Sequence, residues 1–519
     1  MTASFRLVLV ASALSLAGIL PGIAAAQPAA TNLLEAQSGN LPFREPRNRT
    51  DLYDQLQLEY GFTNGRVGVR FEQNRNSEDR FDYEALTQRW AEWSDERLRV
   101  RVGNLYTILG RGLIHRSFEL PAVVLDQPGL RSRYGPSRDV DGALAEGSWG
   151  PVAGRLLGGT PNSGEYSAAP ENELFGLERY VGTLTGGQLA ATIWREARVG
   201  ATYLRTSNGL GTSREFGSGF VELDPLRMAG IAAVSLPIYV EYAQADRPFG
   251  DWWRFSTGEQ DTFALYAGAN LLAGDFTLSA EWKDYREFRL GINDPPSLVR
   301  EHAQTLLNRA THVLNAGRER GFQLEGSWTA RPWGTVTANV SRSDGRGDRF
   351  DERYIELHAA PGGGRVWEAT AFWDVGQDEF SAIADRRIYG AGGTWRLTER
   401  WAVTADVQRQ EATRELPGLA SDSFRDHYAA LTGSLAGWGS VTGQWERSTD
   451  PQQEDPALAG DARIDPRRFL AGIVSATISA HHEATLFVGQ RRGGRACTAG
   501  TCYEVLPFRG VELRLVTRF

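Results

Sequence analysis

Cysteine, lysine and long apolar runs are scarce in this sequence, and each scarcity narrows the range of functions. The two cysteines, Cys497 and Cys502, stand in a polar segment of a 519-residue chain. No histidine or second cysteine pair lies close to them in sequence, and their spacing is not C-x-x-C, so a metal site and thiol redox catalysis are disfavoured. In an oxidising compartment we expect Cys497 and Cys502 to form a disulfide that closes a small loop.

After residue 26 no apolar run approaches the roughly 18–20 residues that a membrane helix requires. The longest candidate, 228–240, is interrupted by Ser235 and Pro237. Mean hydropathy is −0.37. A transmembrane β-barrel can be this polar because half of each strand faces water, whereas composition alone does not separate it from a secreted soluble β-protein.

Lysine occurs once, as Lys283, against 55 arginines, which we interpret as the codon bias of a GC-rich genome. The formal net charge is −8. A mildly acidic chain disfavours nucleic-acid binding, which requires a basic patch.

The first 26 residues have the pattern of a secretory signal peptide. One basic residue, Arg6, precedes an apolar core over 7–20, and Ala24-Ala25-Ala26 forms a small-residue cleavage site before Gln27. We therefore expect a signal peptide at 1–26 and one exported domain at 27–519. No cysteine follows the cleavage site and no plug domain of roughly 130 residues precedes the strands, so neither a lipoprotein anchor nor an active receptor is favoured.

The last nine residues, 511–519, alternate strictly between two faces, as in a β-strand. Val511, Leu513, Leu515, Thr517 and Phe519 share one face, and Glu512, Arg514, Val516 and Arg518 share the other. The segment resembles the closing strand of bacterial outer-membrane barrels, which implies that Phe519 is an assembly signal read by the barrel-assembly machinery. The alternative is an ordinary, half-buried final strand.

Upstream, strands of about ten residues recur, separated by turns that are alternately short and long, which is the topology of outer-membrane barrels. The alternation predicts an all-β, transmembrane, antiparallel up-and-down β-barrel of about 24 strands, with 20 to 26 plausible. An even count requires a weak first strand at 32–41. We expect long connections that include 107–141, 344–352 and 377–386, and a short helix within 302–316. Tryptophans beside short turns predict an aromatic girdle rather than scattered core positions: Trp149, Trp194, Trp333, Trp401 and Trp438.

The segment 107–141 carries more apolar residues than an outer loop in water should. We expect it to fold into the lumen and to form a pore constriction, whereas a cap packed on neighbouring loops is the alternative. The candidate constriction residues are Arg111, His115, Arg116, Glu119, Asp126, Arg131, Arg133 and Asp139.

A resemblance rests on this part of the chain. Gly103-Asn104-Leu105-Tyr106, Gly110-Arg111-Gly112-Leu113, Arg116-Ser117-Phe118-Glu119 and Asp141-Gly142 resemble a family of functionally uncharacterised bacterial outer-membrane barrels. Leu105 stands where that family usually has an aromatic residue. The likeness is clear over about 50–160 and implies a location and a fold, not a substrate.

The strand pattern directs charges of both signs toward the lumen. The candidate lumen-lining residues are Arg70, Arg99, Arg101, Glu241, Glu281, Lys283, Glu325 and Asp406. Strongly selective pores line up rings of one sign, so a mixed lining suits neutral or zwitterionic solutes, or forms structural ion-pair ladders.

Enzymatic activity is disfavoured because no histidine stands with a recognisable nucleophile motif. The acidic residues of 344–352 lack EF-hand spacing, which favours a solvated loop over a calcium site. We therefore expect a porin-like channel of the bacterial outer membrane that passes hydrophilic solutes, without cofactor or metal, in contact with outer-membrane lipids. The alternative is a surface barrel that serves as a scaffold for partner proteins or lipoproteins.

Overall fold

The computed structural model describes residues 27–40, 49–77, 82–120, 124–127, 130–132, 137–162, 182–208, 213–245, 262–314, 317–416, 418, 420–450, 467–498 and 501–519. The expected signal peptide at 1–26 lies outside these residues and stays a prediction. No helix among the described residues is long and apolar enough to cross a membrane.

Twenty-four antiparallel strands form one closed wall. The first half comprises β1 (Gln27–Asn40), β2 (Arg49–Phe62), β3 (Gly65–Asn76), β4 (Tyr83–Ser94), β5 (Leu98–Leu105), β12 (Val140–Trp149), β13 (Val152–Pro161), β14 (Gly182–Trp194), β15 (Ala197–Asn208), β16 (Ser213–Leu223), β18 (Ile238–Ala245) and β19 (Phe263–Ala273). The second half comprises β20 (Phe276–Arg286), β21 (Arg318–Ala330), β22 (Gly334–Gly345), β23 (Asp348–Ala359), β24 (Trp367–Asp378), β25 (Ile383–Arg396), β26 (Trp401–Arg414), β27 (Asp422–Leu435), β28 (Gly439–Ser448), β29 (Arg468–Ser479), β30 (His482–Arg491) and β33 (Phe508–Arg518).

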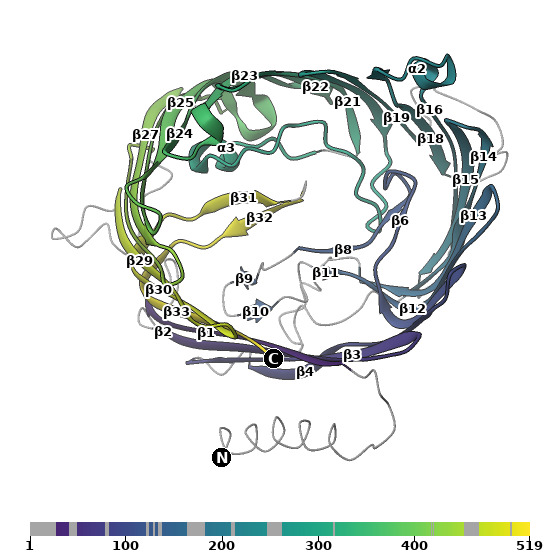
Figure 1. Cartoon of the computed structure of the whole chain (residues 1–519), viewed down its shortest axis with the longest axis horizontal. Helices are drawn as coiled ribbons and strands as arrows, with labels where there is room; N and C mark the ends of the chain where they lie inside the picture. Colours follow the sequence, from purple (N-terminus) through teal and green to yellow (C-terminus); the bar gives the residue numbers. More distant parts are fainter. Residues whose placement is uncertain are drawn as a thin grey trace.

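The wall closes where the first strand pairs with the last, as Figure 1 shows in the view along the barrel axis. In this seam Glu35 pairs in register with Arg514, and β1 pairs with β2 on its other edge. The expected count of 24 and the expected weak first strand are therefore confirmed, although β1 already begins at Gln27. Its outward face carries Asn32, which donates a hydrogen bond to Asp54, so its alternation is less clear than that of later strands.

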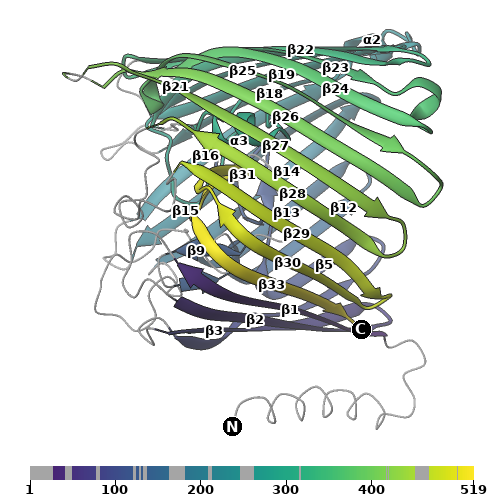
Figure 2. The same cartoon turned by 90° about the vertical axis from the view of Figure 1, so that its left-hand side faces the viewer.

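Figure 2 shows the strands inclined to the barrel axis, with turns at one end and longer connections at the other. The short-turn end also holds one longer connection, with α2 (Pro225–Met228) and β17 (Val234–Ser235), beside the end of β19. At the opposite, long-loop end the expectation of a long connection at 344–352 was wrong, because β22 and β23 are joined by the two-residue turn Arg346-Gly347. The connection within 377–386 is likewise short, with η2 (Glu379–Ser381) followed by Ala382.

The charged residues that suggested a loop at 344–352 therefore belong to strands. Asp344 and Asp351 face outward, whereas Glu352 faces inward and is buried. The expected helix within 302–316 is also shorter than predicted, because only α3 (Thr305–Arg309) is helical. Another short helix, η1 (Pro361–Gly363), lies in the turn between β23 and β24.

The outer face of the wall carries a belt of exposed apolar side chains. On β21, β26 and β29, Leu324, Val407 and Leu470 are 43%, 55% and 67% exposed. The five predicted girdle tryptophans are all exposed, and each lies at or beside a turn at the short-turn end. A closed ladder leaves no unpaired strand edge, and an apolar belt with interfacial aromatics suits hydrocarbon, so the fold is that of a transmembrane barrel.

Above the apolar belt, at the long-loop end of β20–β29, the outward positions become rich in arginine. We call this set the arginine band: Arg286, Arg318, Arg320, Arg342, Arg349, Arg353, Arg387, Arg409, Arg425, Arg447 and Arg468. The carboxylates that share this face on the same strands are fewer, namely Asp284, Asp344, Asp351, Asp385 and Glu411. The band is therefore net positive, although the whole chain is acidic.

We predict that Val407→Arg, which places a charge on the lipid face of β26, lowers the free energy of unfolding in lipid vesicles by about 2–4 kcal/mol. Thr404→Arg, on the lumen face of the same strand, should cost about 1 kcal/mol, because it removes only a side-chain hydrogen bond to Thr394. Denaturant titration followed by heat-modifiable gel mobility measures both. Equal losses would contradict the assigned faces.

Candidate functional site

Among the described residues, three longer segments fold into the barrel from the long-loop end (Figure 1). The short strands β9 (Leu125–Gln127), β10 (Leu130–Ser132) and β11 (Ser137–Arg138) also lie inside the ring. The first lumen segment, 106–120, contains the short strands β6 (Ile108–Leu109), β7 (His115–Arg116) and β8 (Phe118–Glu119), with β6 paired to β7. Its tip meets the inner wall, because the amide of Gly110 donates to Gln188 Oε1 at 3.0 Å and that of Arg111 donates to Glu241 Oε2 at 2.9 Å. Its apolar side chains Leu109, Leu113 and Ile114 are fully buried against wall residues of β12–β20.

The second lumen segment, 287–314, lies against the first. The Arg116 guanidinium forms an ion pair with Asp294, and Asn293 Nδ2 donates to the carbonyl of Leu113 at 2.9 Å. Phe288 and Ile292 join the same apolar cluster as Leu113. The two segments therefore form one packed unit, although about 180 residues separate them in sequence.

Farther along, the second lumen segment is fixed to the wall by α3. Leu306 and Leu307 pack against Tyr354, Phe372 and Ile388, which project inward from β23, β24 and β25. The amide of Leu306, one of the helix-start donors that lack an intrahelical partner, donates to Gln408 Oε1 at 2.9 Å. Arg309 at the other end of the helix forms an ion pair with Glu446 of β28.

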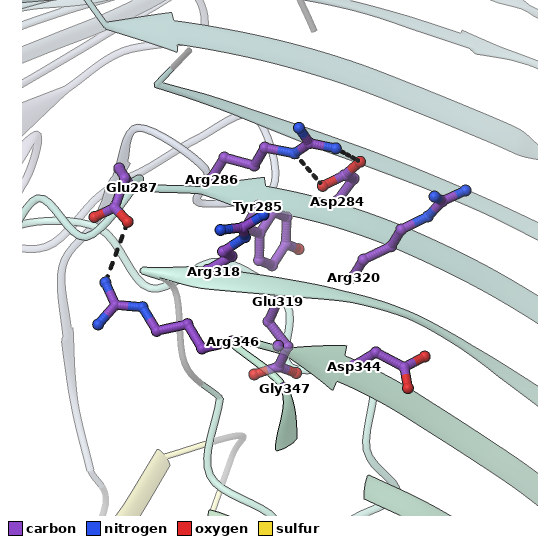
Figure 3. Close-up of a pocket in the computed structure, with 11 residues that line it drawn as sticks. Asp284, Tyr285, Arg286, Glu287, Arg318, Glu319, Arg320, Asp344, Arg346 and Gly347 are labelled. Atoms are coloured by element: carbon purple, nitrogen blue, oxygen red, sulfur yellow. Dashed lines mark hydrogen bonds and ion pairs between the residues drawn. The ribbon is translucent and has the colours of Figure 1, made fainter. Parts of the chain in front are cut away.

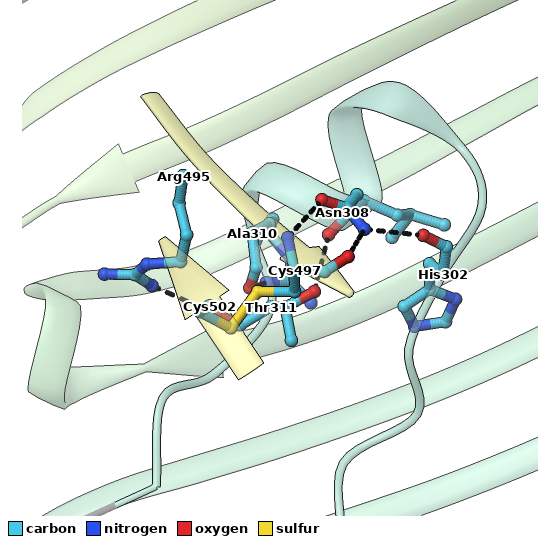
Figure 4. Close-up of a disulfide and its surroundings, with 9 residues drawn as sticks. His302, Asn308, Ala310, Thr311, Arg495, Cys497 and Cys502 are labelled. Carbon is cyan, nitrogen blue, oxygen red and sulfur yellow. Dashed lines mark hydrogen bonds between the residues drawn. A yellow bond between two sulfur atoms is a disulfide. The ribbon is translucent and has the colours of Figure 1, made fainter. Parts of the chain in front are cut away.

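The third segment is the terminal hairpin, 494–505, made of β31 (Gly494–Thr498) and β32 (Thr501–Val505) and closed by the Cys497–Cys502 disulfide. Figure 4 shows it resting on α3. Asn308 holds both backbone groups of Cys497, accepting from its amide at 2.8 Å and donating to its carbonyl at 2.9 Å, and Arg495 donates to the carbonyl of Thr311 at 3.0 Å. The disulfide thus stabilises a hairpin inside the barrel.

The structure distributes the candidate constriction residues over several contacts. Arg111 is exposed and stacks over the Tyr239 ring at 4.9 Å, while His115 is only 1% exposed. Arg116 pairs with Asp294, Glu119 pairs with Arg70 at 2.9 Å, and buried Asp139 accepts from Asn104. Asp126 and Arg131 lie on β9 (Leu125–Gln127) and β10 (Leu130–Ser132), but their side chains, and all of Arg133, lie outside the described residues. Arg138, on β11 (Ser137–Arg138), donates to the carbonyl of Asn293 at 3.3 Å.

Half of the candidate lumen-lining residues act as anchors for these segments. Arg70 binds Glu119 of the first segment, and Glu241 accepts from Arg111. Lys283, which is fully buried, donates to the carbonyl of Ser297 and pairs with Glu319, and Glu325 pairs with Arg300 of the second segment.

The remaining four form contacts within the wall. Arg99 pairs with Glu92 at 3.0 Å and with Glu146 at 2.7 Å, and Arg101 stacks over Trp90. The Tyr266 hydroxyl donates to Glu281 at 2.5 Å, and Gln408 donates to Asp406 at 2.8 Å. These charges are thus satisfied within the wall, by neighbouring strands or, for Asp406, by its own strand β26.

Sequence reasoning missed two buried networks that hold the second segment and the hairpin. Arg386 of β25 pairs with Glu352 at 2.8 Å and Asp374 at 3.0 Å, and donates to the carbonyl of Ala310. Arg492 pairs with Asp426 at 3.1 Å and Glu446 at 2.9 Å. The alternation of side chains along the strands carries a signal for them, because Glu352 and Asp374 occupy inward positions, but the charges of 344–352 favour a loop.

The pKa values of two buried histidines on the lumen segments are shifted in opposite directions. Burial lowers the pKa of His115 to about 4. Burial also opposes the charged form of His312, but the hydrogen bond to Asp378 at 3.3 Å and the ion pair with Glu319 at 3.4 Å outweigh it, so the pKa of His312 is raised. Burial raises the pKa of Asp294, an effect that Arg116 and Arg138 oppose.

We predict that acidification loosens the first lumen segment. Its neutral His115 resists protonation until about pH 4, whereas an exposed histidine takes a proton near pH 6.5, so the segment loses stability as pH falls through this window, by up to about 3 kcal/mol. Hydrogen-exchange protection factors for 106–120, compared at pH 7 and pH 5, measure the loss. His115→Leu should abolish the pH dependence. A wild-type segment as protected at pH 5 as at pH 7 would contradict the assignment.

His312 allows a comparison within the same protein, because the pH dependence of its contribution to stability should have the opposite sign. Its raised pKa means that its contribution is fully present below about pH 6.5 and is lost as pH rises through the raised folded value. In the same exchange experiment we expect 305–314 to stay protected at pH 5 and to lose protection at alkaline pH. His312→Phe should remove that loss while leaving the behaviour of 106–120 unchanged.

Comparison with known proteins adds the following findings. Residues 29–140, which include the motif residues 103–119, match the model of a family of unknown function, DUF6029. No curated protein sequence matches the chain. Among solved structures, the P pilus usher (PapC) translocation pore is similar with a TM-score of 0.46 at 10% identity, over 95% of this chain and 99% of that chain. OpdK from Pseudomonas aeruginosa gives a TM-score of 0.37 at 10% identity, over 71% and 96%, and OccK5 (OpdH) from the same organism gives 0.34 at 11% identity, over 95% and 97%.

Proposed function

We propose that this barrel lies in the bacterial outer membrane and passes small hydrophilic solutes through a lumen narrowed by the three inward segments. One observation carries the proposal: the segments are fixed to the wall by ion pairs such as Arg70–Glu119, Arg300–Glu325 and Arg309–Glu446. Buried Lys283 and Arg386 of the wall also donate to segment carbonyls. Such segments remain in the lumen as a defined constriction rather than moving freely as loose loops. A ring of this strand number is wide enough for a channel unless it is filled.

The chemistry of the lumen supports neutral or zwitterionic solutes. The charges of the inner wall alternate in sign. Partly exposed Arg99 lies between Glu92 and Glu146, and partly exposed Arg514 lies beside Glu35. A lining of paired charges offers hydrogen bonds to a polar solute without the one-signed ring that selects strongly for ions. Constriction residues such as exposed Arg111 would then contact the solute.

The orientation follows from the two ends. Short turns with a tryptophan girdle face the periplasm, and the long-loop end, with the three lumen segments, faces the cell exterior. Phe519 is exposed at the short-turn end, where we propose that the barrel-assembly machinery reads it. Lipids of the outer membrane surround the apolar belt.

We predict that replacing the terminal hairpin, 494–505, by a Gly-Gly-Ser linker raises single-channel conductance in planar bilayers by about twofold, because a ring of this width is restricted mainly by what fills it. The hairpin is a suitable target because it forms no part of the wall. The matched control replaces 229–233, in the turn at the short-turn end, with a linker of two glycines and should conduct like the wild type.

Bilayers that stay closed for the wild type and for both variants would defeat the channel proposal. In that event, retention of a specific protein or lipoprotein by the intact long-loop end would support the scaffold alternative. Unchanged conductance in the hairpin variant, with an open wild type, would place the constriction elsewhere, and the same replacement in 106–120 would then locate it.

A further inference from the structure

We propose that the arginine band is a binding site for the phosphate groups of a membrane lipid, with the lipid's acyl chains packed on the apolar belt directly below. The proposal rests on the membrane-embedding part of the proposed function and is independent of whether the lumen conducts. Nothing in the channel mechanism uses these arginines, because they project from the outer face of β20–β29 and not into the lumen.

The first support is position. On β21 the outward series runs from Trp328 and Leu324 through Phe322 to Arg320, so apolar side chains give way to guanidinium groups within one strand. The Arg320 guanidinium lies over the ring of outward-facing Trp282, at 5.6 Å from its centroid. Arginine stacked on an interfacial aromatic is held at the depth of a lipid headgroup.

The same order recurs seven strands farther round the wall. On β28 the outward series runs from Val441, 60% exposed, through Trp445 to Arg447. On β26 it runs from Val407 to Arg409. The transition therefore occurs at the same place along several strands, as the boundary between hydrocarbon and headgroups would require.

The second support is that the arginine band carries more positive charge than the carboxylates on the same face can neutralise. A solvated rim held by ion pairs would need carboxylates in about equal number, but the band has fewer carboxylates than arginines. Several arginines are paired, for example Arg286 with Asp284 at 3.2 Å and Arg349 with Asp351 at 3.3 Å. Among the described residues, no carboxylate forms an ion pair with Arg318, Arg320 or Arg447, and all three are exposed.

Two of these arginines border a cavity of about 780 Å³ at one end of the band (Figure 3). Arg318 and Arg320, two positions apart on β21, flank it together with Arg346 of the β22–β23 turn, which pairs with Glu287 at 3.1 Å. Tyr285 and Glu319 also border it, but their side chains are buried on the inner face of the wall. Arg286 and the carboxylates Asp284, Glu287 and Asp344 line it as well, but Arg286 and Arg346 are paired with Asp284 and Glu287. Arg318 and Arg320 have no ion pair with a described carboxylate, and their planar donors match phosphate oxygens.

The experiment uses the full-length protein in dodecyl maltoside and native mass spectrometry with added diphosphoryl lipid A or the same lipid dephosphorylated. We expect the phosphorylated lipid to bind preferentially. The triple variant Arg318→Gln, Arg320→Gln, Arg447→Gln should weaken its binding by about 100-fold, since each arginine contributes about one factor of five in attraction to an anionic surface. The matched variant Arg75→Gln, Arg89→Gln, Arg205→Gln removes the same charge from outward positions on β3, β4 and β15 and should bind like the wild type.

Equal binding of the two lipids, or equal weakening by both triple variants, would overturn the proposal. Complete displacement of the lipid by inorganic phosphate alone would assign the band to the free anion and would also overturn it. Single-channel conductance of the band variant separates this site from the channel proposal, because it should stay at the wild-type value. Closed wild-type bilayers would sink the channel and leave the lipid result standing.

Discussion

The closure of the backbone ladder between β1 and β33 is the constraint on which the other features depend. In hydrocarbon an unpaired strand edge leaves amide and carbonyl groups without water, at a cost of several kcal/mol each, so every strand in the wall must have two neighbours. The weakly patterned β1 is held to this role by pairing on both edges, and by Glu35 and Gln37, which meet Arg514 and Glu512 across the seam. Closure at this strand number creates a wide interior, and the interior creates the need for the lumen segments.

Filling that interior with polypeptide brings its own difficulty, because a folded-in loop carries polar backbone groups away from bulk water. The wall solves this with charged and amide side chains at inward positions. Gln188, Glu241 and Gln408 each accept from a backbone amide of a lumen segment. Buried Lys283 and Arg386 each donate to a segment carbonyl while paired to a carboxylate. Buried ion pairs of this kind add little net stability, but removing one partner leaves a buried charge that costs about 3–5 kcal/mol, so they fix a single arrangement of the segments.

Sequence reasoning recovered the wall well because strand alternation and loop length are local signals. In β20 and β21 the outward face is apolar below the arginine band and the inward face is polar, so the alternation alone predicts which side of each strand faces the lumen. The end of β22 and the beginning of β23 are harder to predict, because their residues are charged on both faces: Asp344 and Asp351 face outward and Glu352 faces inward. A charged stretch is therefore not always a loop. Where strands extend beyond the hydrocarbon, both of their faces can carry charged residues.

The interior was less predictable because its decisive contacts are distant in sequence. The apolar content of 107–141 indicates that this segment is packed against other parts of the protein. No pattern in the neighbouring sequence indicates that Arg116 pairs with Asp294 or that Asn308 binds the backbone of Cys497. Likewise, the charges expected to line an open pore are largely satisfied by segments or strands, which a face assignment cannot distinguish from solvent exposure. The position of a residue in the strand alternation predicts whether its side chain points inward or outward. The partner of that side chain depends on which loop enters the barrel.

Arginine has opposite tasks on the two faces of this wall, and the difference follows from its surroundings. On the inner face, Arg386 and Arg492 are each enclosed by two carboxylates, where the planar guanidinium satisfies several acceptors at once. On the outer face, the described carboxylates are too few to pair the band, and none of them forms an ion pair with Arg318, Arg320 or Arg447. Unpaired cations just above an apolar belt are unfavourable next to neutral hydrocarbon but favourable next to anionic headgroups. The same residue type that fixes the contents of the barrel is thus suited, on the other face, to fix its depth in the membrane.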